Sequence, residues 1–84
     1  MRTYAFRVVV EPDEDRWHAH CPALTAWAAA TWGDTPEEAY RNIQDVVQMI
    51  VEGMVEDGIP VPTEAAELLR EPRVTVAVPT PTAA

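Results

Sequence analysis

Hydrophobic residues occupy every second position near the start of the chain. They are Tyr4, Phe6, Val8 and Val10. Such alternation is typical of a strand with one buried face, so we predict a strand over residues 4–10. The polar segment 11–16 follows and contains the proline and aspartates that favour turns. It therefore predicts a hairpin turn.

A second alternating segment follows this turn, with Trp17, Ala19 and Cys21 on one face and His18 and His20 on the other. We predict a second strand here, with the histidines facing outward. The next residue after Cys21 is a proline, which ends the strand.

Two further strands are expected. One lies within residues 26–32, although the alanines of this segment favour strands only weakly. The other spans residues 73–78, where Val74, Val76 and Val78 share one face.

One long helix is predicted from Pro36 to about Asp57. Thr35 is placed to be its N-cap, and Glu38 is placed to complete a capping box by accepting from the Thr35 N–H. Proline suits the first helical position because its missing N–H costs nothing there. Gly58 is the expected C-terminal stop.

The helix carries two adjoining hydrophobic stripes. The first contains Ala39, Ile43, Val46, Ile50 and Met54, and the second contains Tyr40, Val47, Val51 and Val55. One stripe is wide enough for a helix that lies on a sheet. The second is therefore either part of a wide intrachain core or a subunit interface, and we interpret it as the helical contribution to an oligomer interface.

These elements predict an α+β fold with a single sheet and one long helix on one face. The strand order would be 3-2-1-4, with the last strand parallel to the first after a right-handed crossover. Residues 1–78 would form a single domain and residues 79–84 a flexible tail. Residues 63–69 are compatible with a short helical turn.

Composition restricts the partners of this domain. A chain of 84 residues builds only a small core, so a homodimer or higher oligomer is expected. Its formal charge of −8 and its lack of lysine argue against direct nucleic-acid binding and favour a basic protein partner.

Three sequence features bear on localisation. No apolar run is long enough for a membrane span, the start has no signal-peptide pattern, and the single cysteine cannot form an internal disulfide. We therefore expect a cytoplasmic protein.

The candidate chemistry lies on the predicted hairpin. His18 and His20 point the same way and are suited to hold a metal with an acidic residue, but metal sites usually need more ligands than the histidines alone supply. A serine triad is excluded because the chain has no serine. We predict no catalytic, cofactor or metal residues. Instead we expect a partner-binding surface made of Glu11, Asp13, Glu14, Asp15, His18 and His20.

An ordered series of landmarks resembles the HicB-like antitoxin domain. The landmarks are the segment from Val8 to Asp15, Trp17, Pro22-Ala23-Leu24, the segment from Gly33 to Ala39, and the segment from Glu56 to Pro60. The resemblance runs from about Tyr4 to Pro62, with a further strand near Val74 to Val78. One departure is Leu24-Thr25-Ala26-Trp27, where the family usually has a Leu-Pro-Gly-Cys-like turn.

The resemblance implies a reduced ribonuclease-H-like fold and an antitoxin that neutralises a small basic ribonuclease of the HicA type. The carboxylates that a ribonuclease H needs are missing from the inward strand positions, so we expect no enzyme activity. Complete HicB proteins commonly append a DNA-binding domain, which this chain is expected to lack. The main alternative is an orphan homo-oligomeric domain without a toxin partner and with an unknown ligand. A residual metal-dependent nuclease is a remoter one.

Overall fold

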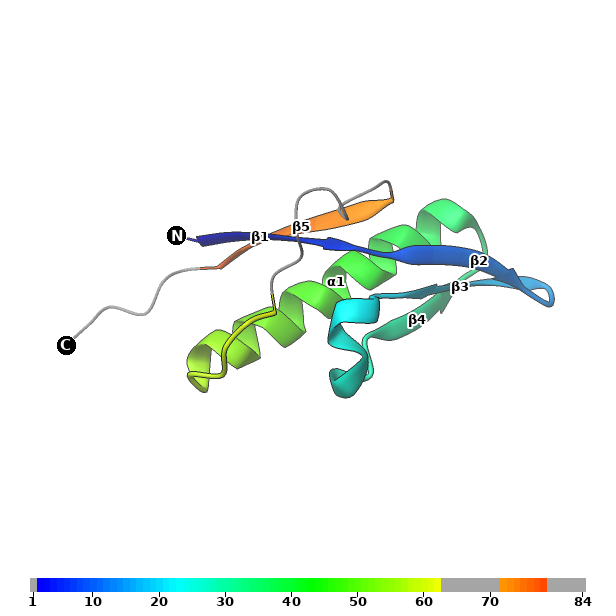
Figure 1. Cartoon of the computed structure of the whole chain (residues 1–84). Helices are drawn as coiled ribbons and strands as arrows, with labels where there is room; N and C mark the ends of the chain where they lie inside the picture. Colours follow the sequence, from blue (N-terminus) through cyan, green and yellow to red (C-terminus); the bar gives the residue numbers. More distant parts are fainter. Residues whose placement is uncertain (1, 63–71, 79–84) are drawn as a thin grey trace.

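The computed structural model describes residues 2–62 and 72–78. Its elements, in chain order, are β1 (Arg2–Arg7), β2 (Val9–Asp13), β3 (Arg16–His20), the 3-10 helix η1 (Pro22–Trp27), β4 (Ala30–Gly33), α1 (Pro36–Glu56) and β5 (Arg73–Val78) (Figure 1). The long helix lies along one side of the strands. The helical turn expected over 63–69 and the tail 79–84 fall outside the described residues.

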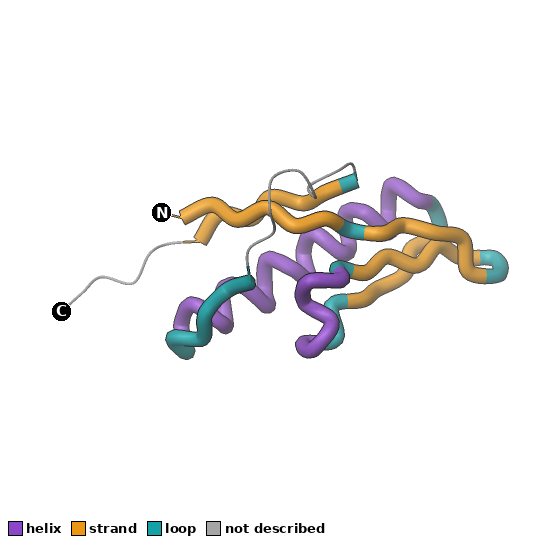
Figure 2. Tube along the Cα trace, viewed as in Figure 1, coloured by secondary structure: helices purple, strands orange, loops and turns teal. Residues whose placement is uncertain are grey.

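The strands form two antiparallel sheets. One has the order β2-β3-β4 and the other pairs β1 with β5. Only Val8 separates β1 from β2, and Figure 2 shows the two strands following one another along one path. The Val8 N–H donates to the Pro72 carbonyl at 3.1 Å, just before β5 begins. The α+β class is as predicted, but the hydrogen bonds do not join the strands into the expected single sheet of order 3-2-1-4.

β5 runs antiparallel to β1, so the expected parallel arrangement is wrong. The reason is the path of the chain after the helix. Pro60 and Val61 line a hollow with Arg2–Tyr4, which places the end of the helical segment beside the start of β1. Pro72 lies beside Val8, at the far end of β1. The chain therefore enters β5 from that end and runs back toward Arg2.

The core lies between α1 and the inward faces of both sheets. Its fully or almost fully buried residues are Phe6, Val8, Ala19, Cys21, Leu24, Ala29, Ala39, Ile43, Val47, Val51, Met54, Val74, Val76 and Val78. Tyr40 and Val55 pack against this core and are partly buried. The stripe that we interpreted as an oligomer interface thus faces inward: Val47 and Val51 are 0% exposed within the chain itself.

Local signals place both ends of α1. The Thr35 hydroxyl accepts from the Glu38 N–H at 3.1 Å, as predicted. The Glu38 carboxylate accepts from the N–H of Asp34 at 3.1 Å. The capping box predicts the N–H of Thr35 as the donor, which is one residue later. At the other end, Gly58 has a φ of 70°, and the Ile59 N–H donates to the Met54 carbonyl at 2.8 Å. These contacts form a Schellman motif.

The strand expected within residues 26–32 is β4, which covers the last three of these residues and Gly33. Residues 22–27 before it form η1, which begins with Pro22 in its first turn and is held by a 2.8 Å bond from the Thr25 hydroxyl to the Pro22 carbonyl. It ends at Ala28, whose φ is 57°. Only then does the chain become extended, so β4 is confined to Ala30–Gly33.

Polar side chains of α1 bond to strand carbonyls of both sheets. The Tyr40 hydroxyl donates to the Arg73 carbonyl, and the Gln48 amide donates to the Ala77 carbonyl at 2.9 Å. The Asn42 amide donates to the Trp32 carbonyl in β4 at 2.8 Å. The helix is therefore tied to β5 and β4 by hydrogen bonds as well as by the core.

Candidate functional site

The outer face of the β2-β3-β4 sheet gathers the polar residues singled out in the sequence. Paired residues of neighbouring strands lie on the same face, and the register pairs Glu11 with His18 and His18 with Trp32. Ala19 points the other way, into the core, as does Cys21 beyond the strand end. The prediction that the histidines face away from the core is confirmed.

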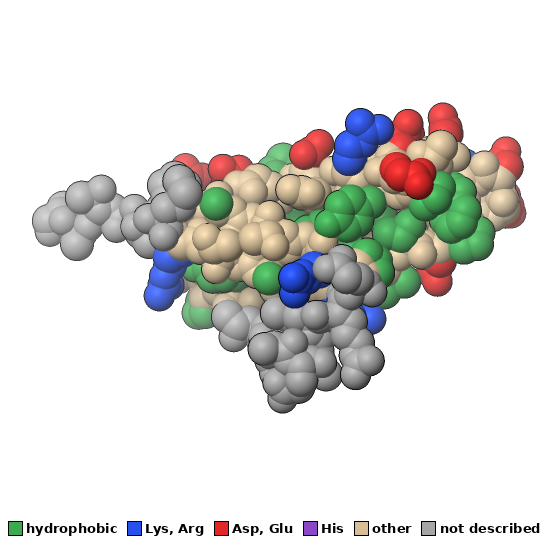
Figure 3. Space-filling model, turned by 90° about the horizontal axis from the view of Figure 1, so that it is seen from above, with side chains coloured by type: hydrophobic (Ala, Val, Ile, Leu, Met, Phe, Trp, Pro, Cys, Tyr) green, Lys and Arg blue, Asp and Glu red, His purple; other side chains and the backbone are tan. Residues whose placement is uncertain are grey.

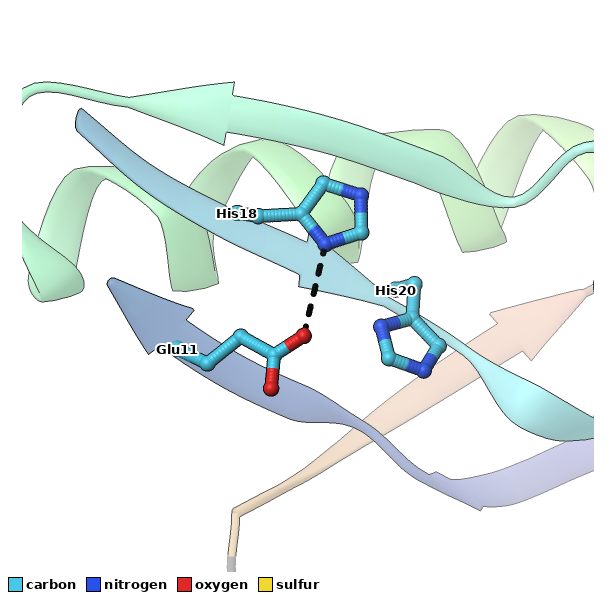
Figure 4. Close-up of side chains that lie close together, drawn as sticks. All are labelled: Glu11, His18 and His20. Carbon is cyan, nitrogen blue, oxygen red and sulfur yellow. Dashed lines mark ion pairs between the residues drawn. The ribbon is translucent and has the colours of Figure 1, made fainter. Parts of the chain in front are cut away.

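Glu11, His18 and His20 come together on this face (Figure 4). One ligand atom from each lies within 4.8 Å of the others. The Nδ1 of His18 is 4.0 Å from the Glu11 carboxylate oxygen, and the two imidazole rings stack with centroids 5.3 Å apart. The Nδ1 of His20 is buried, and no group in the described part of the chain hydrogen-bonds to it. Two nitrogens and one oxygen are thus placed where they could hold a metal ion.

Trp32 forms one wall of this cluster. Its ring centroid lies 4.9 Å from that of His18, and its indole N–H donates to the Asp13 carboxylate at 3.0 Å. The Arg16 guanidinium lies 5.8 Å from the centroid of the same ring. The sequence pattern did not indicate the place of Trp32 beside the histidines. Only the register of β4 reveals it, and an alanine-rich segment does not specify that register.

The remaining acidic residues of the hairpin lie apart from the cluster. Asp13 contacts Trp32, whereas Glu14 and Asp15 form the turn at the tip of the hairpin and are exposed. Glu14 has a φ of 58°, which a tight two-residue turn requires. The structure thus brings Glu11, His18 and His20 together and leaves the other predicted site residues around them.

A shallow groove of about 360 Å³ lies beside the start of α1. Its lining is mostly apolar and includes Val10, Pro36, Tyr40 and Pro72, with Glu37 and Arg41 at its polar parts. Figure 3 shows hydrophobic side chains gathered toward one end of the molecule on this view, with acidic side chains beside them. The groove is therefore an apolar surface with one acidic and one basic side chain in its lining.

The inward faces of the sheets carry no buried polar or charged residue among those that the structure describes. A metal-dependent ribonuclease needs carboxylates that converge on its ions.

Among the residues that the structure describes, α1 is not apolar enough to cross a membrane, and no other helix is long enough.

The fold identifies the class of protein. It is similar to the N-terminal domain of the antitoxin HicB from Burkholderia pseudomallei, with a TM-score of 0.63 over 89% of this chain and 98% of that domain. The two sequences are 22% identical, so this likeness concerns the fold. The chain thus has the fold of a HicB antitoxin domain. No protein-family model matches the sequence.

Sequence similarity identifies the family. A UPF0150 protein of Synechocystis sp. is 36% identical over 62 residues, which cover 73% of this chain and 76% of that protein. The chain belongs to the UPF0150 family, which is HicB-like, and the resemblance noted in the sequence is confirmed.

Proposed function

We propose that this domain is an antitoxin that binds and neutralises a small basic ribonuclease toxin of the HicA type in the cytoplasm. The observation that carries the proposal is the likeness of the whole fold to the N-terminal domain of a HicB antitoxin. Membership of a HicB-like family supports it independently. Neutralisation would occur by covering the surface with which the toxin meets RNA.

The charge of the chain favours a basic partner. Its net charge of −8 attracts a positive protein and repels nucleic acid, so we propose no direct binding to DNA or RNA. The proposed contact surface is the outer face of the hairpin and its tip, which contain Glu11, Asp13, Glu14, Asp15, His18 and His20. Trp32 is 41% exposed beside these groups and supplies an aromatic anchor of the kind that contributes most to binding.

We propose no catalytic activity for this domain, because the inward strand positions are apolar where a ribonuclease H has carboxylates. Incubation with RNA or an RNA–DNA hybrid and magnesium or manganese tests this. Cleavage that disappears in Asp13→Ala or His18→Ala would show that the domain is a nuclease.

The decisive experiment is co-expression with a small basic protein that a gene next to this one encodes, where the genome has such a neighbour. We expect the two chains to co-purify and the antitoxin chain to restore growth that the neighbour alone arrests. Association should slow as salt rises, since screening weakens long-range attraction between opposite charges.

Charge reversal at the hairpin tip locates the surface. The double variant Glu14→Lys and Asp15→Lys should weaken binding and slow association. The matched control is Glu52→Lys with Glu56→Lys, which makes the same charge change on exposed positions near the end of α1, away from the hairpin (Figure 1). Equal effects of both pairs would mean that only net charge matters.

Co-expression also decides between the two candidate functions. If no complex forms and toxicity is unchanged, the orphan homo-oligomeric domain replaces the antitoxin proposal.

A further inference from the structure

We propose that Glu11, His18 and His20 form a binding site for a divalent transition-metal ion, namely zinc. The strand register brings the ligands together. Glu11 pairs directly with His18 across β2 and β3, and His20 lies on the same face because side chains two residues apart in a strand point the same way. Figure 4 shows both imidazoles and the carboxylate turned toward one another.

One buried nitrogen of this cluster has no hydrogen-bond partner among the described residues, and a metal ion would supply one. The Nδ1 of His20 is buried and lacks a hydrogen bond from the described residues, which is costly for a polar atom. The Nδ1 of His18 is 4.0 Å from Glu11, which is too far for a hydrogen bond. An ion between the three side chains would satisfy both nitrogens and the carboxylate at once.

The geometry is close to what zinc requires. A tetrahedral zinc ion about 2.1 Å from each ligand spaces its ligand atoms by about 3.4 Å. The three ligand atoms lie within 4.8 Å of one another, so side-chain movements that shorten the longest of these distances by up to about 1.4 Å bring the atoms into range. Glu11 has the freedom for this movement, because its side chain is 56% exposed.

The donor set selects the type of metal. Two imidazole nitrogens and one carboxylate oxygen suit zinc and its neighbours in the first transition row, whereas magnesium and calcium prefer oxygen ligands. Three protein ligands leave one position of a tetrahedral ion for water. Cys21 is not a ligand, since it is buried on the opposite side of the sheet.

A tryptophan beside the site can report on metal binding. Trp32 stands 4.9 Å from His18, so a bound ion that fixes the imidazole should change tryptophan fluorescence.

The test is zinc binding by the full chain without a histidine tag, measured by titration calorimetry and by tryptophan fluorescence. We expect saturable binding of one ion per chain. Zinc at about 100-fold above its dissociation constant should raise the thermal unfolding midpoint by about 10–20 °C, since it binds only the folded state. Cobalt should bind with the visible absorption of a tetrahedral site, and magnesium and calcium should not compete.

Glu11→Gln, His18→Gln and His20→Gln should each weaken zinc binding at least about tenfold, because each removes a ligand. The matched controls, Glu14→Gln and Asp15→Asn, change acids of the same hairpin outside the cluster and should bind zinc like the parent chain. Glu11→Gln is nearly isosteric and exposed, so it keeps the test valid if a histidine variant fails to fold. Absence of zinc binding, or equal binding by Glu11→Gln and the controls, would overturn the proposal.

Discussion

A Cβ atom on Gly33 would lie 2.4 Å from the backbone nitrogen of Ala39. The last residue of β4 therefore touches the backbone of the first turn of α1, and only glycine permits this approach. The contact fixes how the strand delivers the chain into the helix. It also gives a structural reason for the glycine that precedes the helix cap in the segment from Gly33 to Ala39.

Gly33→Ala is expected to destabilise the domain by about 3 kcal/mol, because the clashing atoms belong to the backbone and cannot rotate away. The matched control is Gly53→Ala in the middle of α1, where an added Cβ meets nothing within 4 Å. It should stabilise the domain by up to about 1 kcal/mol through helix propensity. Urea unfolding at one fixed protein concentration measures both. Similar effects of the two variants would show that the close contact at Gly33 does not exist in solution.

Gly58→Ala should cost about 1 kcal/mol, since a φ of 70° places an L-residue in the left-handed region. The surrounding space is open, so the cost comes from the backbone alone. Gly58→Asn should recover part of the loss, because asparagine tolerates this conformation best after glycine. Equal stability of the alanine and glycine forms would mean that the helix does not end in a Schellman motif.

Thr35→Ala should lower the free energy of unfolding by about 1 kcal/mol, since it removes the side-chain acceptor for the Glu38 N–H. Thr35→Ser keeps the hydroxyl and should be nearly neutral. Far-UV circular dichroism during urea unfolding gives both values. A serine variant as weak as the alanine variant would indicate that the methyl group matters rather than the cap.

The ends and faces of the regular elements were largely predictable from local signals. Pro36, Thr35 and Gly58 specify where α1 begins and ends whatever the rest of the chain does, and the valines of β5 specify its inward face. The direction of β5 was not predictable, because it depends on where the chain goes between Val61 and Pro72. Pro22 marked the end of β3 but did not predict η1. A proline fits both the residue after a strand and the first turn of a helix, so it does not distinguish the two.

The residues of the proposed binding surface could be named from the sequence, but their geometry could not be predicted. The histidines, Glu11 and the other hairpin acids were identified from spacing alone. Their convergence depends on the pairing of Glu11 with His18, which follows from a tight turn at Glu14 and Asp15 rather than the longer turn expected over residues 11–16. A shift of one residue would place Glu11 on the core side.

Val47→Ala should reduce stability by about 2 kcal/mol, because it removes two buried methyl groups and leaves a cavity. It should leave the oligomeric state unchanged, since Val47 is 0% exposed within one chain. The control is Met49→Ala, whose side chain is 66% exposed and whose loss should change stability by less than about 0.5 kcal/mol. A Val47 variant that dissociates without losing stability would restore the interface interpretation of the second stripe.

Self-association is still expected, since a domain of this size builds a small core. Sedimentation equilibrium at micromolar concentration should show a species at least twice the 9.3 kDa of one chain. If only the single-chain mass appears, the expectation of an oligomer is wrong.

The hydrogen bonds from α1 to the strands affect how such an oligomer can form. Pro72 turns its carbonyl toward Val8, and successive carbonyls alternate along a strand, so the carbonyls of Arg73 and Ala77 face away from β1. Tyr40 and Gln48 occupy these two acceptors. An added strand would have to displace both side chains to extend the ladder, which protects the domain against runaway edge-to-edge polymerisation. We therefore expect copies of this acidic domain to meet through their side chains and not by strand addition at β5.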